Sequence, residues 1–331
     1  MFIVSVFFEN RNMKHTKYTF LLPAYKPDFF EEALRSIKEQ TYSDFKVLVS
    51  DDCSPHDLKS IFDKVCGDDE RFKYRRNEEN MGGKSLVSHW NLLVDMCDTE
   101  YLILASDDDV YEKTFLEEVD KLARKYPEVD LIRARCKMFN ESCNFAFYDG
   151  LYQEFTDALE FVYLMYLHNS VKCIANYVFR LEAIKEIGGF IDFPLAWFSD
   201  RATVMKLSSH GVANTKDVLF SFRMSDVNIT FGKNDEKKIY EKEHATLLYD
   251  KWFNQFMTSF EEHKTDMNAY QRGMLLLVDG EHRELIKNEI SRYLPNLSFC
   301  HFLEYVNKLD EWLYRVYCFL VYCKTFIKGQ K

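Results

Sequence analysis

The sequence predicts an α/β fold: a mostly parallel sheet flanked by helices, followed by a C-terminal helical extension. The main observation is that short apolar runs alternate with helical patterns of roughly ten to fifteen residues between positions 18 and 134. Such alternation is typical of βαβ units, which build parallel sheets. A second observation is that the chain has a helical pattern from residue 235 onward.

The expected strands are short apolar or β-branched runs at 18–22, 45–50, 72–76, 101–105, 129–134 and 176–180. Pro23 should end the first strand, because proline has no N–H for a sheet ladder. The expected helices have apolar residues three or four positions apart, at 29–40, 57–65, 85–96, 114–126 and 181–187. Gly188 should end the last of these, and a further helix should begin near Asp200.

Composition sets broad limits on what the chain can be. Its net charge of −10 over 331 residues argues against broad electrostatic binding to nucleic acid. Nine cysteines without a Cys-x-x-Cys pair indicate free thiols and a cytoplasmic location. The apolar segment 1–8 has neither a basic start nor a small-residue cleavage site, so we expect no signal peptide. We expect a main domain at 1–232 and a helical extension at 233–331.

Three consecutive carboxylates, Asp107, Asp108 and Asp109, follow the apolar run at 101–105. Because isolated charges are costly to bury, they should lie just beyond the carboxyl end of this strand. A hard divalent cation such as Mn²⁺ or Mg²⁺, shared with substrate phosphates, would offset their mutual repulsion. The alternative is a solvated turn in which Asp109 or Thr114 caps the next helix.

Two other strand ends also carry residues suited to ligand binding. Pro23 and Tyr25 follow the first strand, and Asp51 and Asp52 follow the second. Parallel strands with right-handed crossovers bring these ends to one edge of the sheet, where open α/β sheets bind ligands. The three strand ends together therefore predict one binding site.

This chain resembles the inverting glycosyltransferases of family 2, which have the GT-A fold, over roughly residues 16–230. The resemblance is carried, in order, by Leu22-Pro-Ala-Tyr25, Val49-Ser-Asp-Asp-Cys-Ser54, Asn80-Met-Gly-Gly83, Ser106-Asp-Asp-Asp109, and Gly188-Gly-Phe190 with Asp200 after it. It implies a bacterial enzyme of surface-polysaccharide or lipopolysaccharide assembly. That enzyme would move a sugar from a nucleotide diphosphate, with UDP the leading nucleotide, to a hydroxyl of a glycan or lipid-linked acceptor.

The resemblance also assigns roles to nucleotide-site residues. Pro23, Tyr25, Asp51 and Asp52 match the nucleotide pocket, although the two acids could instead cap the following helix. Gly83 allows close backbone approach at a helix start, and Lys84 could either reach a diphosphate or lie solvated in a plain loop.

The remaining roles concern metal and catalysis. Asp108 matches the metal ligand, Asp107 matches the residue that contacts ribose or metal-bound water, and a one-residue slip would give Asp109 the ligand role. Asp200 matches the catalytic base, with a helix N-cap as the alternative. The chain departs from the family pattern at Cys53 (usually Gly), at Trp90 (often Arg) and at Ser199 (commonly Glu).

The C-terminal region offers two interpretations. The stripe of Trp252, Phe256 and Phe260 is expected to be core. The apolar segment 312–323 is shorter than the roughly 20 residues that span a bilayer, and three lysines follow it. This segment either packs as core or makes peripheral contact with the inner face of the membrane.

Two rival functions stay open at this level. A sugar-phosphate nucleotidyltransferase would need a Gly-rich basic loop after the first strand, where this chain has Pro23-Ala-Tyr-Lys-Pro-Asp28. A non-catalytic nucleotide-sugar binding module would not need Asp200.

Overall fold

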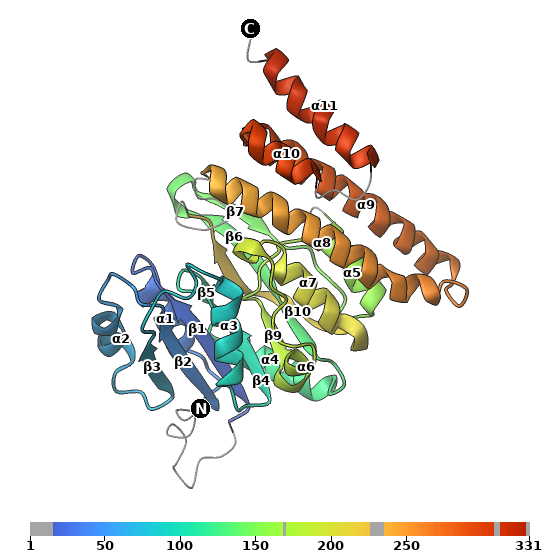
Figure 1. Ribbon diagram of the computed structural model, residues 1–331. Coiled ribbons are helices and arrows are strands. Elements are labelled where there is room, and N and C mark those ends of the chain that lie inside the picture. Colours follow the sequence, from blue (N-terminus) through green and yellow to red (C-terminus); the bar gives the residue numbers. More distant parts are fainter. Residues whose placement is uncertain (1–15, 168–169, 226–234, 308–311, 329–331) are drawn as a thin grey trace.

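The computed structural model describes residues 16–167, 170–225, 235–307 and 312–328. Its centre is one sheet with the order β3-β2-β1-β4-β9-β6-β10-β5, with β7 paired to β6 and β8 to β10. Helices cover both faces of this sheet, and a helical region follows it (Figure 1). The predicted α/β class with a C-terminal helical extension is therefore confirmed.

The first half of the sheet is parallel, as predicted. β1 (Tyr18–Ala24) lies between β2 (Phe45–Asp51) and β4 (Tyr101–Leu104), and β2 pairs with β3 (Phe72–Arg76). All these strands point the same way, so their carboxyl ends share one edge.

Pro23 does not end β1, contrary to the prediction, because the strand continues to Ala24. Leu21 accepts a hydrogen bond from the N–H of Ala105, on the side of β4. Pro23 is two residues further on and faces the same side, beyond the last paired residue, Leu104. No ladder bond is lost there, so proline is tolerated.

The second half of the sheet is mixed. β9 (Tyr177–Arg180) is antiparallel to both β4 and β6 (Leu131–Asn140), whereas β10 (Val212–Arg223) is parallel to β6. Three short strands complete it: β5 (Val110–Tyr111), β7 (Phe145–Tyr148) and β8 (Phe155–Thr156). β10 was missed from the sequence because Asn214 to Asp217 interrupt its apolar pattern.

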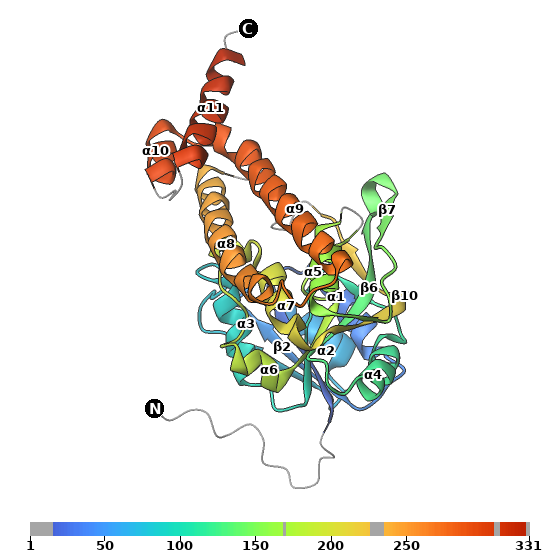
Figure 2. The ribbon, with the colours of Figure 1, turned by 90° about the vertical axis from the view of Figure 1, so that its right-hand side faces the viewer.

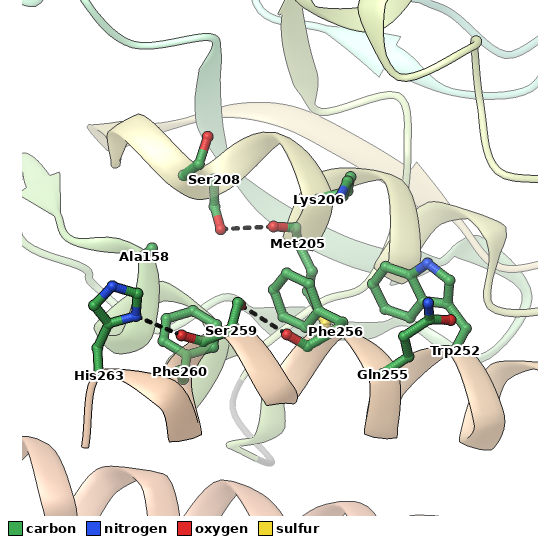
Figure 3. Close-up of a pocket in the computed structure, with 11 residues that line it drawn as sticks. Ala158, Met205, Lys206, Ser208, Trp252, Gln255, Phe256, Ser259, Phe260 and His263 are labelled. Atoms are coloured by element: carbon green, nitrogen blue, oxygen red, sulfur yellow. Dashed lines mark hydrogen bonds between the residues drawn. The ribbon is translucent and has the colours of Figure 1, made fainter. Parts of the chain in front are cut away.

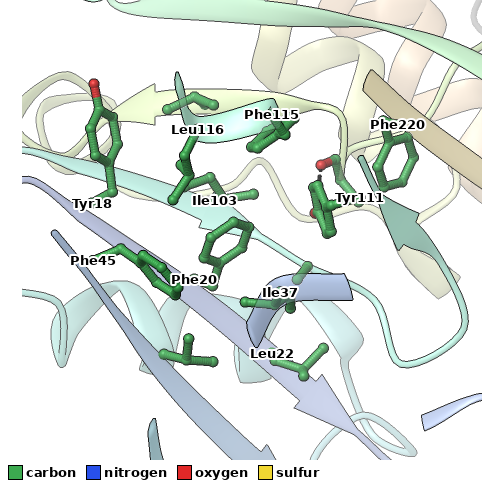
Figure 4. Close-up of a cluster of buried hydrophobic side chains, with 14 of the residues drawn as sticks. Tyr18, Phe20, Leu22, Ile37, Phe45, Ile103, Tyr111, Phe115, Leu116 and Phe220 are labelled. Carbon is green, nitrogen blue, oxygen red and sulfur yellow. Dashed lines mark hydrogen bonds between the residues drawn. The ribbon is translucent and has the colours of Figure 1, made fainter. Parts of the chain in front are cut away.

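The helices lie close to their predicted positions. They are α1 (Phe30–Lys38), α2 (Leu58–Cys66), α3 (Leu86–Asp95), α4 (Phe115–Lys125), α6 (Leu181–Glu186) and α7 (Ser199–Leu207), with α5 (Ala158–Tyr166) in addition. Alternate residues of β1 face different cores: Phe20 packs with α1 and α4, and Leu21 packs with α3 and α5. Figure 4 shows the first of these cores around Phe20.

The C-terminal region consists of α8 (Glu236–Glu262), α9 (Ala269–Tyr293), α10 (Phe299–Asn307) and α11 (Trp312–Lys328). Phe253 of α8 and Val278 of α9 belong to the same buried cluster as Leu21, so these two helices share the core of the sheet. α10 and α11 extend away from the sheet (Figure 2). The predicted domain boundary at 232/233 lies outside the described residues.

Within the described ranges, no helix combines the length and apolar character that a bilayer crossing needs.

Candidate functional site

The acidic loop after β4 lies at the edge where β1 also ends. Asp107, Asp108 and Asp109 are all buried, with at most 6% of each residue exposed. One Asp107 oxygen, Oδ2, accepts hydrogen bonds from the backbone N–H groups of Tyr25 and Lys26, at 2.8 and 2.9 Å. The loop after β1 is thereby fixed to the loop after β4.

Lys26 supplies the positive charge that this cluster needs. Its Nζ lies 2.6 Å from Asp108 Oδ2 and 3.5 Å from Asp107 Oδ1. Burial alone would lower the pKa of Lys26, but the two carboxylates outweigh it and raise the pKa. Burial raises the pKa of Asp107, and the Lys26 ammonium opposes that rise. Lys26 was not among the predicted site residues, although it directly follows Tyr25.

Asp109 is turned toward a different partner. Its Oδ1 accepts the N–H of Arg223 at 2.8 Å, and Arg223 Nε donates to the backbone oxygen of Asp108 at 3.0 Å. Burial, followed by the Asp108 charge, raises the pKa of Asp109 well above its usual range. Asp109 thus joins the loop to the end of β10, and its predicted metal role stays a prediction.

The donor chemistry decides whether a divalent ion fits. No group of three or more His, Cys, Asp or Glu side chains that could hold a metal occurs among the described residues. Asp107 and Asp108, however, place carboxylate oxygens beside a cation, the Lys26 ammonium. Oxygen ligands of this kind suit Mg²⁺ or Mn²⁺, which commonly take their other ligands from water and substrate phosphates. The residues therefore fit a metal bound jointly with a diphosphate.

Asp51, at the end of β2, has both carboxylate oxygens engaged. Oδ1 accepts the Ser54 N–H at 2.7 Å, and Oδ2 accepts the Tyr74 hydroxyl at 2.6 Å and a bond from Arg76. Asp51 is fully buried, so in this structure it shapes the turn after β2.

Asp52 fixes the glycine loop. Its Oδ1 accepts bonds from Asn77 Nδ2 at 2.7 Å and the Met81 N–H at 2.9 Å, and its Oδ2 accepts the Gly82 N–H at 2.7 Å. A Cβ on Gly82 would lie 2.9 Å from Asp52 Oδ2, so the close approach requires glycine. Asp52 thereby positions the start of α3.

The predicted ligand-facing residues are more open. Tyr25 is 40% exposed, and its backbone oxygen accepts the Ser54 hydroxyl at 2.6 Å. Pro23 is half-buried beside it, and Gly83 is exposed. Lys84 is exposed and pairs with Glu79 at 2.6 Å. Tyr25 is thus accessible at the carboxyl end of β1.

The Gly188-Gly189-Phe190 turn is clamped to α3 by Asn91. Asn91 Oδ1 accepts the Phe190 N–H at 2.7 Å, and Asn91 Nδ2 donates to the Phe190 oxygen at 3.1 Å. Both glycines have positive φ, +85° and +95°. This clamp joins the glycine-loop side of the site to the segment that leads to Asp200.

The backbone before Asp200 is strained. Leu195, Ala196 and Phe198 all have positive φ, which is costly for residues with a Cβ. Several interactions hold this segment: Phe198 stacks on Tyr249 with ring centroids 4.5 Å apart, the Trp197 indole N–H donates to Glu289 at 3.1 Å, and the Phe193 N–H donates to Ser199 Oγ at 3.1 Å. Backbone strain of this kind clusters at functional sites.

Asp200 lies in the first turn of α7 and is partly exposed. Its Oδ1 accepts the N–H of Arg201 at 2.7 Å. Burial raises the pKa of Asp200, whereas Arg201 and, more weakly, Lys172 oppose that rise. Burial also lowers the pKa of Lys172 to about 7. Lys172 was missed because nothing in its local sequence signals its nearness to Asp200.

The pKa of one buried thiol, Cys173, depends on charges at both the acidic loop and Asp200. Burial raises the pKa of Cys173 well above its usual range, and the charges of Asp109 and Asp200 both add to it. The acidic loop and the start of α7 therefore lie within electrostatic reach of the same side chain.

Comparisons with known proteins agree with this geometry. The model of the family described as "Glycosyl transferase family 2" matches residues 19–187, just over half of the chain. A GalNAc(5)-diNAcBac-PP-undecaprenol β-1,3-glucosyltransferase of Campylobacter jejuni subsp. jejuni serotype O:2 is 34% identical over 79 residues. That match spans 24% of this chain and 25% of that enzyme.

Two solved structures share the fold. S. aureus TarS 1-349, solved with UDP-GlcNAc, has a TM-score of 0.57 at 14% identity, over 95% of this chain and 92% of that one. The mannosyltransferase PcManGT from Pyrobaculum calidifontis, solved with GDP-Man and Mn²⁺, has a TM-score of 0.51 at 13% identity, over 94% and 87% of the two chains. On the evidence of the family match and of this shared architecture, the chain belongs to glycosyl transferase family 2, has the GT-A fold and is a glycosyltransferase.

Proposed function

We propose that this glycosyltransferase is metal-dependent and inverting, and that it moves a sugar from a UDP-sugar to an acceptor hydroxyl. The observation that carries the proposal is the buried pair Asp107–Asp108, held at the β1/β4 edge with Lys26 as counter-charge. This edge is where α/β sheets bind nucleotides. A cation that these carboxylates need would also attract the negative diphosphate of a nucleotide-sugar donor.

Each predicted residue has a part in this proposal. Asp108, with Asp107 beside it and Asp109 as the alternative ligand, would hold Mn²⁺ or Mg²⁺. When bound, that ion neutralises charge on the departing diphosphate. Tyr25 and Pro23 would cover the base, Asp51 and Asp52 would form the wall of the nucleotide pocket, and Gly83 and Lys84 would approach the diphosphate.

Asp200 would act as the general base. A hydroxyl is a weak nucleophile, so its proton must leave as oxygen bonds to the anomeric carbon. The raised pKa of Asp200 strengthens it as a proton acceptor, provided that it is ionised. Attack from the face opposite the diphosphate would invert that carbon.

The acceptor we propose is a lipid-linked glycan used in polysaccharide assembly at the cytoplasmic face of the membrane. The Campylobacter enzyme is named for an undecaprenol-linked glycan, which supports this class of acceptor. α10 and α11 expose Phe299, Leu303, Phe319 and Leu320, each at 40–64%, and this apolar surface is suited to peripheral membrane contact.

Calorimetry tests the metal and donor assignment. Wild-type protein should bind UDP in the presence of Mn²⁺, and Asp108→Asn should lose this Mn²⁺-dependent binding. Asp95→Asn, at the exposed end of α3, is the matched control and should bind as the wild type does. Wild-type affinity in a folded Asp108→Asn protein would refute the metal site. Tighter binding of GDP or dTDP than of UDP would refute the donor assignment.

A further inference from the structure

A cavity lies away from the acidic loop, between α7 and the C-terminal half of α8. It has a volume of about 570 Å³, and its lining includes Lys206, Trp252, Gln255, Phe256 and Phe260. Figure 3 shows the three aromatic rings in a row along α8, facing the end of α7. None of the predicted site residues lines it.

The aromatic row is only partly used by the core. Trp252 and Phe256 stack with centroids 5.1 Å apart at an interplanar angle of 8°, and Phe260 meets Phe256 edge-on. All three rings pack on the buried cluster with one side and stay half-buried. Their remaining surfaces form an apolar wall in the cavity.

Polar groups with unused hydrogen-bonding capacity surround this wall. Within the described ranges, neither the Gln255 amide nor the Lys206 ammonium nor the Trp252 indole N–H has a hydrogen-bond or ion-pair partner. The Ser259 and Ser208 hydroxyls donate to backbone oxygens, at 2.9 and 2.8 Å, and keep lone pairs to accept with. The site therefore offers an apolar wall with several donors and acceptors at its rim.

We propose that this cavity binds an oligosaccharide segment of the acceptor glycan, as a site separate from the reaction centre. A pyranose ring has an apolar C–H face and a rim of hydroxyls, which matches an aromatic wall bordered by donors and acceptors. A lipid chain would cover the wall but would make no use of the donors and acceptors at its rim. The choice of a glycan rests on the proposed function.

The position of the cavity fits a holding role. Lys206 and Asp200 are six residues apart on α7, so they are separated by about 9 Å along the helix axis. A glycan bound beside Lys206 would raise the local concentration of acceptor near the enzyme without contacting the reacting atoms.

Calorimetric titration of the full chain with a panel of N-acetylhexosamine, hexose and uronate pentasaccharides tests this site. At least one should bind, and Gln255→Ala and Lys206→Ala should each weaken that binding about fivefold or more, since each removes hydrogen bonds. Asn254→Ala is the matched control: Asn254 is an exposed amide next to Gln255 on α8 but lies outside the lining. Its affinity should equal that of the wild type.

The remaining outcomes separate this site from the proposed function. Asp200→Asn should retain pentasaccharide binding, and UDP should not compete with it. Trp252→Phe keeps the ring stack and should remove any change in tryptophan fluorescence on binding. The proposal is overturned if no pentasaccharide binds, if binding is unaffected by Gln255→Ala and Lys206→Ala, or if laurate rather than a sugar occupies the cavity.

Discussion

At the scale of single residues, this site depends on how charges are partnered. Asp108 is close to an ammonium, Asp109 faces a backbone N–H, and Asp51 and Asp52 use their oxygens within the protein. Four carboxylates that look alike in the sequence thus have different tasks. Asp200 differs from them because it is partly exposed and its Oδ1 accepts the N–H of its neighbour Arg201.

Asp200→Asn should lower the transfer rate by about two to four orders of magnitude, the usual contribution of a general base. Donor affinity should change little, because the base does not hold the nucleotide. Initial rates with saturating donor, together with calorimetric donor binding, check both points. Asp95→Asn, at the exposed end of α3, is the matched control, and Asp192 is the next candidate for the base. Near-normal transfer by Asp200→Asn would move the base elsewhere.

The transfer rate should also depend on pH through Asp200. Burial raises its pKa, so the active carboxylate is lost at a higher pH than for an ordinary aspartate. The rate should therefore fall as the pH drops through that raised value. Lys172→Met removes a cation that opposes the rise in the pKa of Asp200. The acidic limb of the pH–rate profile of this variant should therefore shift to higher pH. Lys185→Met, on α6, is the control. If the pH–rate profile of Lys172→Met is unshifted, Lys172 does not influence the pKa of the base.

At the scale of elements, short contacts between distant segments assemble the site. Asp107 joins β4 to the loop after β1, Asp52 joins β2 to the start of α3, and Asn91 joins α3 to the turn before Asp200. Each contact pairs a side chain with a backbone group. The spacing of the elements therefore depends on the identity of one residue in each pair, Asp107, Asp52 or Asn91.

Gly189→Ala should destabilise the protein more than Gly188→Ala. Both glycines have positive φ, which costs an alanine about 1–2 kcal/mol. An added Cβ on Gly189 would also lie 2.5 Å from Asn91 Oδ1, whereas at Gly188 nothing lies within 4 Å. The extra cost should be about 1–3 kcal/mol. Urea unfolding of the two variants measures the difference in stability. Equal unfolding midpoints would show that the Asn91 side chain moves aside at little cost.

At the scale of the whole molecule, α8 and α9 complete the core, whereas α10 and α11 project from it (Figure 2). Cys318 and Tyr322 of α11 are buried against α10 and its neighbours. Phe319 and Leu320 on the same helix are exposed, as are Arg315 and Lys324. The two interpretations of segment 312–323, as a packed helix and as an exposed surface, therefore apply to different faces of α11.

Leu320→Glu should reduce co-sedimentation with anionic vesicles by severalfold, because it places a negative charge on the exposed apolar face. Leu276→Glu on α9 is the matched control, since Leu276 is 66% exposed and Leu320 64%. UDP binding should be unchanged in both variants. If the wild-type chain does not sediment with vesicles at low salt, or if both variants lose binding equally, this surface does not dock on membranes.

The sequence by itself determined the features that depend on local chemistry. Apolar runs such as 101–105 fixed the parallel strands, and the charges of Asp107 to Asp109 placed a polar loop beyond the last of them, because charge is excluded from a strand interior. Gly188 and Gly189 marked a turn for a local reason as well, since their backbone conformation favours glycine.

Only the tertiary structure decided which groups satisfy those charges. Arg223 lies 114 residues from Asp109 and meets it because β10 returns beside β5, a pairing that no local pattern encodes. The same holds for Asp52 with the glycine loop and for the cavity between α7 and α8. Hydrogen bonds and burial depend on which segments the fold brings together, whereas propensity and periodicity depend on neighbours in the sequence.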